Sequence, residues 1–409
     1  MARLSRALLA AAAVAANVSA QQQQQAQEQL PEGLHGLMVA AGKEYFGTAT
    51  DVNNIEDEDY QSILQYQGEF GMVTPENSQK WEFTQPRRDE FVYTNADKVV
   101  GRAEEIGQLV RCHALTWHSQ LPMFVSTTQW NASTLASFLT THIDNVVTHF
   151  AGQCYAWDVV NEALNEDGSY RNSTFYQYLG EEYITLSFEA AAKADPAAKL
   201  YYNDFNLETS PKKAAGAERI VRLVQEAGAR IDGVGFQAHL VVGQTPPRKN
   251  LTALLSRFAS LGVEVAYTEL DIAHEFPKNS SNRIPDAAAL EQQAEDYVAV
   301  VGSCLDEPKC VGVTVWQFTD EYSWVPDAFE GRDQACLWTR DYKKKPAYDA
   351  VSKLLREAAA NNTGVNTNST EDILEPIPSN GAAAAAAAAG GWVGRVALGA
   401  ALVVGMALL

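Results

Sequence analysis

Short apolar segments alternate with amphipathic segments along most of this chain, and this alternation restricts the fold more than any other feature. The apolar segments, which predict strands, lie at 45–50, 69–74, 111–117, 155–161, 199–203, 233–238, 263–269 and 311–316. The amphipathic segments, which predict helices, include 96–109, 133–150, 182–194, 211–227, 251–261 and 286–304. Alternating strands and helices favour a parallel sheet, and eight repeats favour closure into an α/β (β/α)₈ barrel. We expect one barrel domain over residues 31–359.

Two glutamates stand at the ends of predicted strands, where barrels of this type place their active sites. Glu162 ends the run Ala-Trp-Asp-Val-Val-Asn-Glu, and Glu269 ends the run Val-Glu-Val-Ala-Tyr-Thr-Glu. A pair of carboxyl groups can cleave a glycosidic bond, because one protonates the leaving oxygen while the other attacks or stabilises the anomeric carbon. The two residues therefore predict an acid and a nucleophile that face each other across a sugar-binding cleft.

The neighbours of each glutamate suggest which role it has. Gln237 and His239 end the strand before Glu269, and Asp271 follows it closely. A histidine that donates to a carboxylate keeps it ionised and oriented, which suits Glu269 to act as nucleophile. Apolar Trp157 lies near Glu162 in the sequence, and Asn161 beside it can reach a sugar hydroxyl. Partial desolvation would favour a protonated Glu162, which suits it to act as acid/base.

The segment 111–122 is the most specific motif, with His113, Trp117, His118 and Gln120 at one strand mouth. Two histidines five positions apart could be read as metal ligands, but no third ligand with metal spacing accompanies them, so we expect no metal. Glu76, Asn77 and Lys80 follow another strand, and together these residues form a dense set of hydrogen-bonding groups for sugar hydroxyls. Trp316 and Trp324 could supply flat faces for sugar rings.

These motifs resemble those of the endo-β-1,4-xylanases of glycoside hydrolase family 10, in the same order and spacing, over residues of about 31–357. The resemblance implies a retaining double displacement with Glu162 as acid/base and Glu269 as nucleophile, the latter supported by His239 and Asp271. It also implies a set of residues that hold or frame the xylose units. They are Glu76, Asn77, Lys80, His113, Trp117, Gln120, Asn161, Asn203, Gln237, His239, Trp316 and Trp324. One departure is Gln317, which follows Trp316 where relatives often have a smaller residue.

The expected activity is hydrolysis of internal β-1,4 links of xylan and xylo-oligosaccharides by a monomer that uses no cofactor. A retaining pair requires carboxyl groups about 5 to 5.5 Å apart. Two alternatives stay open at this point. One is a cellulase or mixed-linkage glucanase on the same barrel, which would need room for a hydroxymethyl group near Lys80, Gln120 and Trp324. The other is a non-catalytic glycan-binding protein of the cell wall.

The charge balance excludes one class of partner. The formal net charge is −20, and phosphate-rich partners require a positive field over the binding surface. We therefore expect no nucleic-acid binding.

Five cysteines leave one thiol without a partner if the chain is exported. Cys304 and Cys310 enclose a short loop with a proline and are predicted to form a disulfide. Cys112 and Cys154 each precede a strand and could bridge neighbouring strands, which would leave Cys336 free.

Both ends of the chain carry signals of export. Residues 1–20 combine two arginines, an apolar run and a small-residue cleavage point, and predict a signal peptide. A glutamine-rich spacer (21–30) follows, and a polar stalk is predicted at 360–380. Residues 381–409 resemble a glycosylphosphatidylinositol (GPI) anchor signal that is removed, attached at Ser379, Asn380 or Gly381, although a spanning helix is the alternative. We expect a secreted glycoprotein, held at the cell surface by the anchor or released.

Overall fold

Eight parallel strands close into a barrel in a computed structural model that describes residues 30–278, 280 and 283–362. In spatial order the strands are β1 (Tyr45–Thr50), β2 (Met72–Pro75), β3 (Leu109–Cys112), β5 (Ala156–Asn161), β6 (Lys199–Asp204), β7 (Gly233–Phe236), β9 (Glu264–Glu275) and β10 (Cys310–Val315). The barrel closes because β10 pairs in parallel with both β9 and β1. The predicted (β/α)₈ fold is confirmed.

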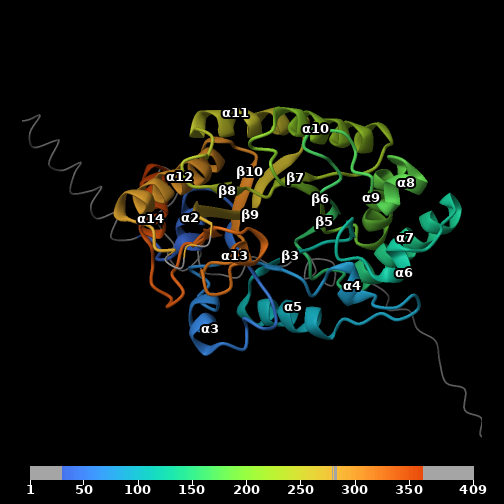
Figure 1. Cartoon of the computed structure of the whole chain (residues 1–409), viewed down its shortest axis with the longest axis horizontal. Coiled ribbons are helices and arrows are strands. Elements are labelled where there is room, and N and C mark those ends of the chain that lie inside the picture. Colours follow the sequence, from blue (N-terminus) through green and yellow to red (C-terminus); the bar gives the residue numbers. More distant parts are fainter. Residues whose placement is uncertain (1–29, 279, 281–282, 363–409) are drawn as a thin grey trace, which may run out of the picture.

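Helices surround the barrel on the outside (Figure 1). The longer ones are α5 (Thr94–Ile106), α7 (Ala132–His149), α9 (Glu182–Ala194), α10 (Pro211–Glu226), α11 (Arg248–Ala259), α12 (Ala287–Asp306) and α14 (Pro346–Asn362). The shorter ones are α2 (Leu34–Ala40), α3 (Glu58–Leu64), α4 (Trp81–Thr84), α6 (Met123–Ser126), α8 (Thr174–Leu179) and α13 (Val325–Ala328).

Helix α10 illustrates why these segments become helices. Ser210 caps its first turn by accepting a hydrogen bond from the Lys213 amide, and Pro211 occupies the first turn, where its missing N–H costs nothing. Its buried apolar residues recur every three or four positions, so that one face packs on the barrel.

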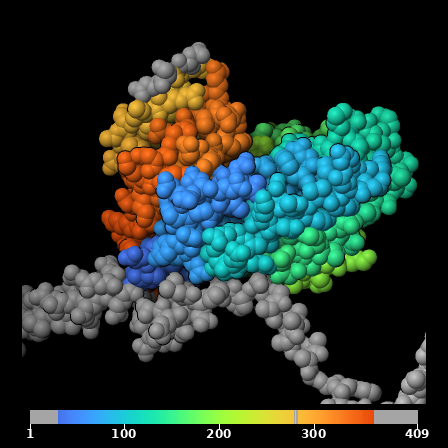
Figure 2. Space-filling view, turned by 90° about the horizontal axis from the view of Figure 1, so that it is seen from below, coloured from blue at the N-terminus to red at the C-terminus, as the bar shows by residue number. Residues whose placement is uncertain are grey.

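The two ends of the barrel domain lie side by side. Figure 2 shows the blue N-terminal part against the orange C-terminal part, in agreement with the pairing of β1 and β10. The final helix continues through Asn362, slightly beyond the domain end predicted at residue 359. Because first and last strands are hydrogen-bonded neighbours, the sheet has no open edge at this point.

Three predicted strands differ from the structure by three residues or more at one end. The strand predicted at 111–117 is interrupted, because β3 ends at Cys112 and a separate β4 (Thr116–Trp117) follows. Between them the His113 amide donates to the side chain of Gln79 rather than to a strand. The strand predicted at 69–74 is β2, which starts later, at Met72.

The strand predicted at 263–269 is much longer than expected, because β9 continues beyond the barrel to Glu275. Its extension pairs with β8 (His239–Val241) in parallel and with β11 (Arg332–Asp333) in the antiparallel sense. Glu269 therefore lies within a strand and not at its end.

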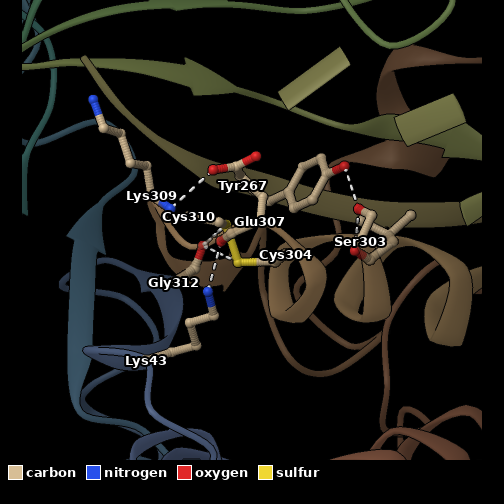
Figure 3. Close-up of a disulfide and its surroundings, with 9 residues drawn as sticks. Lys43, Tyr267, Ser303, Cys304, Glu307, Lys309, Cys310 and Gly312 are labelled. Atoms are coloured by element: carbon tan, nitrogen blue, oxygen red, sulfur yellow. Dashed lines mark hydrogen bonds between the residues drawn. A yellow bond between two sulfur atoms is a disulfide. The ribbon is translucent and has the colours of Figure 1, made fainter. Parts of the chain in front are cut away.

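Two disulfides join the predicted cysteine pairs. Cys112 bonds with Cys154, and Cys304 bonds with Cys310, while Cys336 is free and buried. Figure 3 shows the second bridge, where the backbone carbonyl of Glu307 in the enclosed loop accepts a hydrogen bond from Lys43.

Several predictions concern residues outside the described part of the chain. These are the signal peptide (1–20), most of the spacer (21–30), most of the stalk (360–380) and the anchor signal (381–409). Within the described part, no helix has the length and apolar character that crossing a membrane requires. Asn131, Asn172, Asn250 and Asn361 each begin an Asn-X-Ser/Thr sequence that predicts N-glycosylation, and all four are exposed.

Candidate active site

A cleft of about 640 Å³ opens at the C-terminal ends of the barrel strands and collects nearly all the predicted site residues. Its lining includes Glu76, Asn77, Lys80, His113, Trp117, Gln120, Asn161, Glu162, Gln237, His239, Glu269, Asp271, Trp316 and Trp324. Residues from seven of the eight barrel strands or the segments that follow them meet here, as the barrel topology predicts.

Glu269 is held rigidly inside β9. Its Oε1 accepts a hydrogen bond from Asn203 Nδ2 at 2.8 Å, and its Oε2 lies 3.2 Å from His239 Nε2. Burial acts to raise the pKa of Glu269, but the His239 hydrogen bond and the charges of His113 and His239 outweigh burial and hold the pKa below its ordinary value. The carboxylate is thus kept ionised, as a nucleophile requires.

His239 connects Glu269 to a second carboxylate. Its Nδ1 lies 2.9 Å from Asp271 Oδ2, and the same oxygen accepts a hydrogen bond from Trp324 Nε1 at 2.8 Å. Burial acts to lower the pKa of His239, but Asp271 and Glu269 together raise it to about 10. The imidazole is therefore protonated at neutral pH and donates to both carboxylates.

Glu162 follows β5 directly and has an unusual backbone conformation, with φ of 54°. Its amide donates to the Asn203 carbonyl at 2.9 Å, and its own carbonyl accepts from Arg171 Nε at 3.1 Å. Its Oε1 accepts hydrogen bonds from Asn161 Nδ2 at 3.3 Å and Gln237 Nε2 at 3.2 Å. These contacts turn a half-buried carboxyl group into the cleft.

Asn203 has a different position from the one predicted. We expected it to contact the substrate, but its side chain is fully buried and does not line the cleft. Asn203 Nδ2 donates to Asn161 Oδ1 at 2.9 Å as well as to Glu269, and Asn203 Oδ1 accepts from Thr268. From its buried position behind the cleft, Asn203 therefore orients Glu269 directly and orients Asn161, which contacts Glu162.

A second group of polar residues forms one wall of the cleft. Lys80 Nζ donates to Gln120 Oε1 at 2.8 Å and to Asn77 Oδ1 at 3.1 Å, and it lies 4.7 Å from the centre of the Trp117 ring. Burial lowers the pKa of Lys80, an effect that Glu269 and Glu76 oppose. Burial has the opposite effect on the acidic Glu76, whose pKa it raises to about 7. This wall offers donors and acceptors that match sugar hydroxyls.

His113 forms the floor next to Trp316, with ring centres 5.5 Å apart. Its Nδ1 lies 2.9 Å from Asp158 Oδ2, and Arg111 donates to both oxygens of the same carboxylate. The Nδ1 contact orients the imidazole, so that its Nε2 is directed away from Asp158.

Some cleft residues were not predicted from the sequence. They are Ser119, Phe205, Asn206, Leu240, Ala273, Val325, Phe329 and Arg332. Phe205 and Asn206 follow β6 directly, so their place at a strand end was a signal that could have identified them. Ser119 lies inside the motif at 111–122, next to Gln120, which was another such signal. The remaining residues come from extensions beyond the barrel, which have no marker in the sequence. Among the described residues, no group of three or more His, Cys, Asp or Glu could hold a metal ion.

Comparison with known proteins agrees with this geometry. Residues 33–354 match the model of Glycosyl hydrolase family 10. The chain is 56% identical over 329 residues to endo-1,4-beta-xylanase 5 of Pyricularia oryzae, covering 80% of each protein. It is 51% identical over 324 residues to endo-1,4-beta-xylanase 1 of Humicola insolens, covering 79% of this chain and 74% of that protein.

Solved structures give the same assignment. The endo-1,4-beta-xylanase XylE of Penicillium canescens superposes with a TM-score of 0.76 at 39% identity, covering 80% of this chain and 98% of that one. A xylanase of Bispora sp. MEY-1 solved with xylobiose superposes with a TM-score of 0.75 at 39% identity, covering 79% and 100%. On these matches and on the cleft described above, the chain belongs to glycosyl hydrolase family 10.

Proposed function

We propose that this protein is a retaining endo-1,4-β-xylanase, with Glu269 as nucleophile and Glu162 as acid/base. The observation that carries the proposal is the asymmetry of the two carboxyl groups. Glu269 accepts from protonated His239 and from Asn203, whereas Glu162 accepts only from neutral amides and is half-buried. Two carboxyl groups in different environments, facing one cleft, suit a double displacement.

In the first step the Glu269 carboxylate attacks the anomeric carbon, while Glu162 gives its proton to the leaving glycosidic oxygen. The C–O bond to the leaving sugar breaks, and an ester between Glu269 and the glycosyl unit forms. In the second step Glu162, now ionised, takes a proton from water, and the hydroxide oxygen displaces Glu269. Two inversions give net retention.

Xylan as substrate is supported by the relatives, which are named endo-1,4-beta-xylanases, and by related structures described as complexes with xylobiose. Lys80, Gln120 and Trp324 line the cleft and are held in place by hydrogen bonds, Lys80 to Gln120 and Trp324 to Asp271. Such a wall suits a sugar without a hydroxymethyl group.

Product analysis from xylohexaose tests the proposal. Mass spectrometry should find xylobiose to xylotetraose, and proton NMR should find the β-anomer first. The Glu269→Gln variant should lose turnover while still binding the oligosaccharide. Initial rates should be far higher on xylan than on carboxymethyl cellulose; the reverse order would favour a glucanase, and inactivity of the wild-type protein would contradict the assignment.

We further propose that the protein is exported as a monomer and held at the cell surface by a GPI anchor. The tail 381–409 supports this, because its apolar terminal run of 14 residues is shorter than the roughly 20 that a spanning helix requires. A phospholipase specific for such anchors should release the enzyme from membranes of the producing cells. Retention on the membrane would favour a spanning segment.

A further inference from the structure

Gln317 is a buried glutamine behind the cleft that none of the steps above uses. It follows Trp316 after β10, its side chain is fully buried, and it does not line the cleft. Its Nε2 donates to Glu76 Oε1 at 2.7 Å and to Asn54 Oδ1 at 3.2 Å, and its Oε1 accepts from the Tyr60 hydroxyl at 2.9 Å. Every polar atom of the amide is thus engaged.

The orientation of this amide follows from one unambiguous donor. The backbone N–H of Asp51 donates to Asn54 Oδ1 at 2.8 Å, which identifies that atom of Asn54 as oxygen. Gln317 must therefore present its NH₂ group to Asn54, and hence also to Glu76. The result is a directed chain of hydrogen bonds that ends on Glu76 Oε1.

The same loop fixes the backbone around Glu76. Asp51 Oδ2 accepts hydrogen bonds from the amides of Asn77 at 2.7 Å and Ser78 at 2.9 Å. With its Oε1 engaged by Gln317, Glu76 has no hydrogen-bond partner for Oε2 among the described residues, and the residue lines the cleft. One carboxylate oxygen is thereby left for a sugar hydroxyl.

The backbone of Gln317 is held in an unfavourable conformation. Its φ is 71°, in the left-handed region that glycine adopts without cost and that other residues adopt at a cost in free energy. A glycine here would remove that cost but would leave Glu76, Asn54 and Tyr60 without this partner. A strained residue whose side chain ends on a cleft carboxylate suggests a functional role.

We propose that Gln317 is a positioning residue for substrate recognition, which engages one oxygen of Glu76 and leaves the other turned to a xylose hydroxyl. This proposal rests on the proposed function and adds to it a determinant of substrate affinity outside the cleft lining. Gln317 contacts neither glutamate of the reaction, so its effect should fall on KM and not on kcat.

The charges around Glu76 make the effect depend on pH. Asp51 and Glu269 disfavour its ionised form, Lys80 favours it, and the Tyr60 hydroxyl lies nearby without charge at neutral pH. Burial is the largest influence and raises the pKa of Glu76 to about 7, while Gln317 opposes this rise. Ionised Glu76 can accept one hydrogen bond from Gln317 and another from the substrate. Substrate should therefore bind more tightly, and KM should fall, as pH rises through about 7.

The test is steady-state hydrolysis of xylohexaose between pH 5 and 9 by Gln317→Leu, which keeps the approximate volume but removes the donor. We expect KM to rise by about 10- to 100-fold at pH 7 with kcat within about twofold of wild type, as for a lost hydrogen bond to a charged group. The midpoint of the curve of KM against pH should move upward by about one pH unit.

A second variant, Gln317→Glu, keeps an acceptor for Tyr60 but places a carboxyl group against Glu76. The pair can share a proton at low pH and must separate when both are ionised. We expect KM near the wild-type value at pH 5 and at least about tenfold higher at pH 8.

Gln108→Leu is the matched control. Gln108 is also a buried glutamine, but it precedes β3, and its Nε2 donates to the carbonyls of Leu64 and Phe70, both at 2.9 Å, at the barrel end opposite the cleft. Its loss should lower the melting temperature but leave KM and its pH dependence unchanged.

Equal changes of KM in Gln317→Leu and Gln108→Leu would overturn the proposal. A Gln317→Glu variant whose KM has the same pH dependence as wild type would also overturn it. Neither result would affect the proposed function, which stands on retaining hydrolysis of xylohexaose by the wild-type enzyme. Absence of that hydrolysis would instead contradict the proposed function itself.

Discussion

His239 Nδ1 lies 2.9 Å from Asp271 Oδ2. Asp271 and Glu269 lie on the same strand, β9, and the Asp271 carboxylate favours the protonated form of the histidine that contacts Glu269. The three side chains form a line of carboxylate, imidazolium and carboxylate. The positive charge of the imidazolium balances the negative charge of the two carboxylates in a buried site.

We predict that Asp271→Asn lowers activity most at alkaline pH. Burial lowers the pKa of His239 and Asp271 raises it, so removing the Asp271 charge brings that pKa down from about 10 towards neutrality. Above the new pKa, Glu269 loses its charged donor. Rates on xylohexaose should fall about 10- to 100-fold at pH 8 and by less at pH 5.

Trp324→Phe serves as the control for that prediction, because it removes a hydrogen bond to Asp271 Oδ2 but keeps the carboxylate charge. Its KM should increase, since Trp324 lines the cleft, while the alkaline side of its pH profile stays as in wild type. If Trp324→Phe lost as much activity at alkaline pH as Asp271→Asn does, the orientation of Asp271 and not its charge would be decisive.

We predict that Glu162→Ala separates the two chemical steps. An aryl xylobioside with a good leaving group needs no acid, so the variant should still form the ester on Glu269 and then stall. Azide, which needs no general base, should restore turnover and give a β-glycosyl azide. An α-azide product would contradict the assignment of Glu269 as nucleophile.

The two disulfides should differ in their contribution to stability. The bridges join positions 42 and 6 residues apart, for which the chain-entropy relation gives about 4 and about 2 kcal/mol. Replacing Cys112 and Cys154 together by alanine should therefore lower the free energy of unfolding by more than replacing Cys304 and Cys310. Urea unfolding of the two double variants measures the difference; the opposite order would contradict it.

We predict that Asp158→Asn destabilises the fold by about 3–5 kcal/mol, because it leaves Arg111 as an uncompensated charge inside the barrel. Burial raises the pKa of Asp158, but Arg111 and His113 hold it below its ordinary value. The wild-type advantage should thus be complete at neutral pH and shrink as pH falls through the native pKa. Breaking the exposed pair Arg87–Glu90 with Arg87→Ala should leave the melting temperature unchanged.

Much of the site was predictable because it is local in sequence. Glu162 and Gln237 directly follow strands, and Glu269 lies where the apolar run meets polar residues, so topology alone brings them to one rim. The (β/α)₈ fold follows from the number and spacing of the apolar segments. None of this needs knowledge of side-chain orientation.

What the sequence could not show depends on contacts between distant segments. Asn203 has the same strand-end placement as residues that face the cleft, and only packing buries it behind them. The extension of β9 follows from pairing with β8 and β11, which are far from it in sequence. Gln317 could be noticed as unusual, but its hydrogen bonds to Asn54 and Glu76 join three separate loops.

The long strand β9 has a further consequence for how the reaction proceeds. Glu269 lies midway along a strand whose first half pairs in the barrel and whose second half pairs with β8 and β11, so its backbone is clamped on both sides of the site. The backbone of the proposed nucleophile therefore has a fixed position. If Glu269 attacks as proposed, the anomeric carbon has to approach the carboxylate, because the strand cannot bring the carboxylate to the sugar.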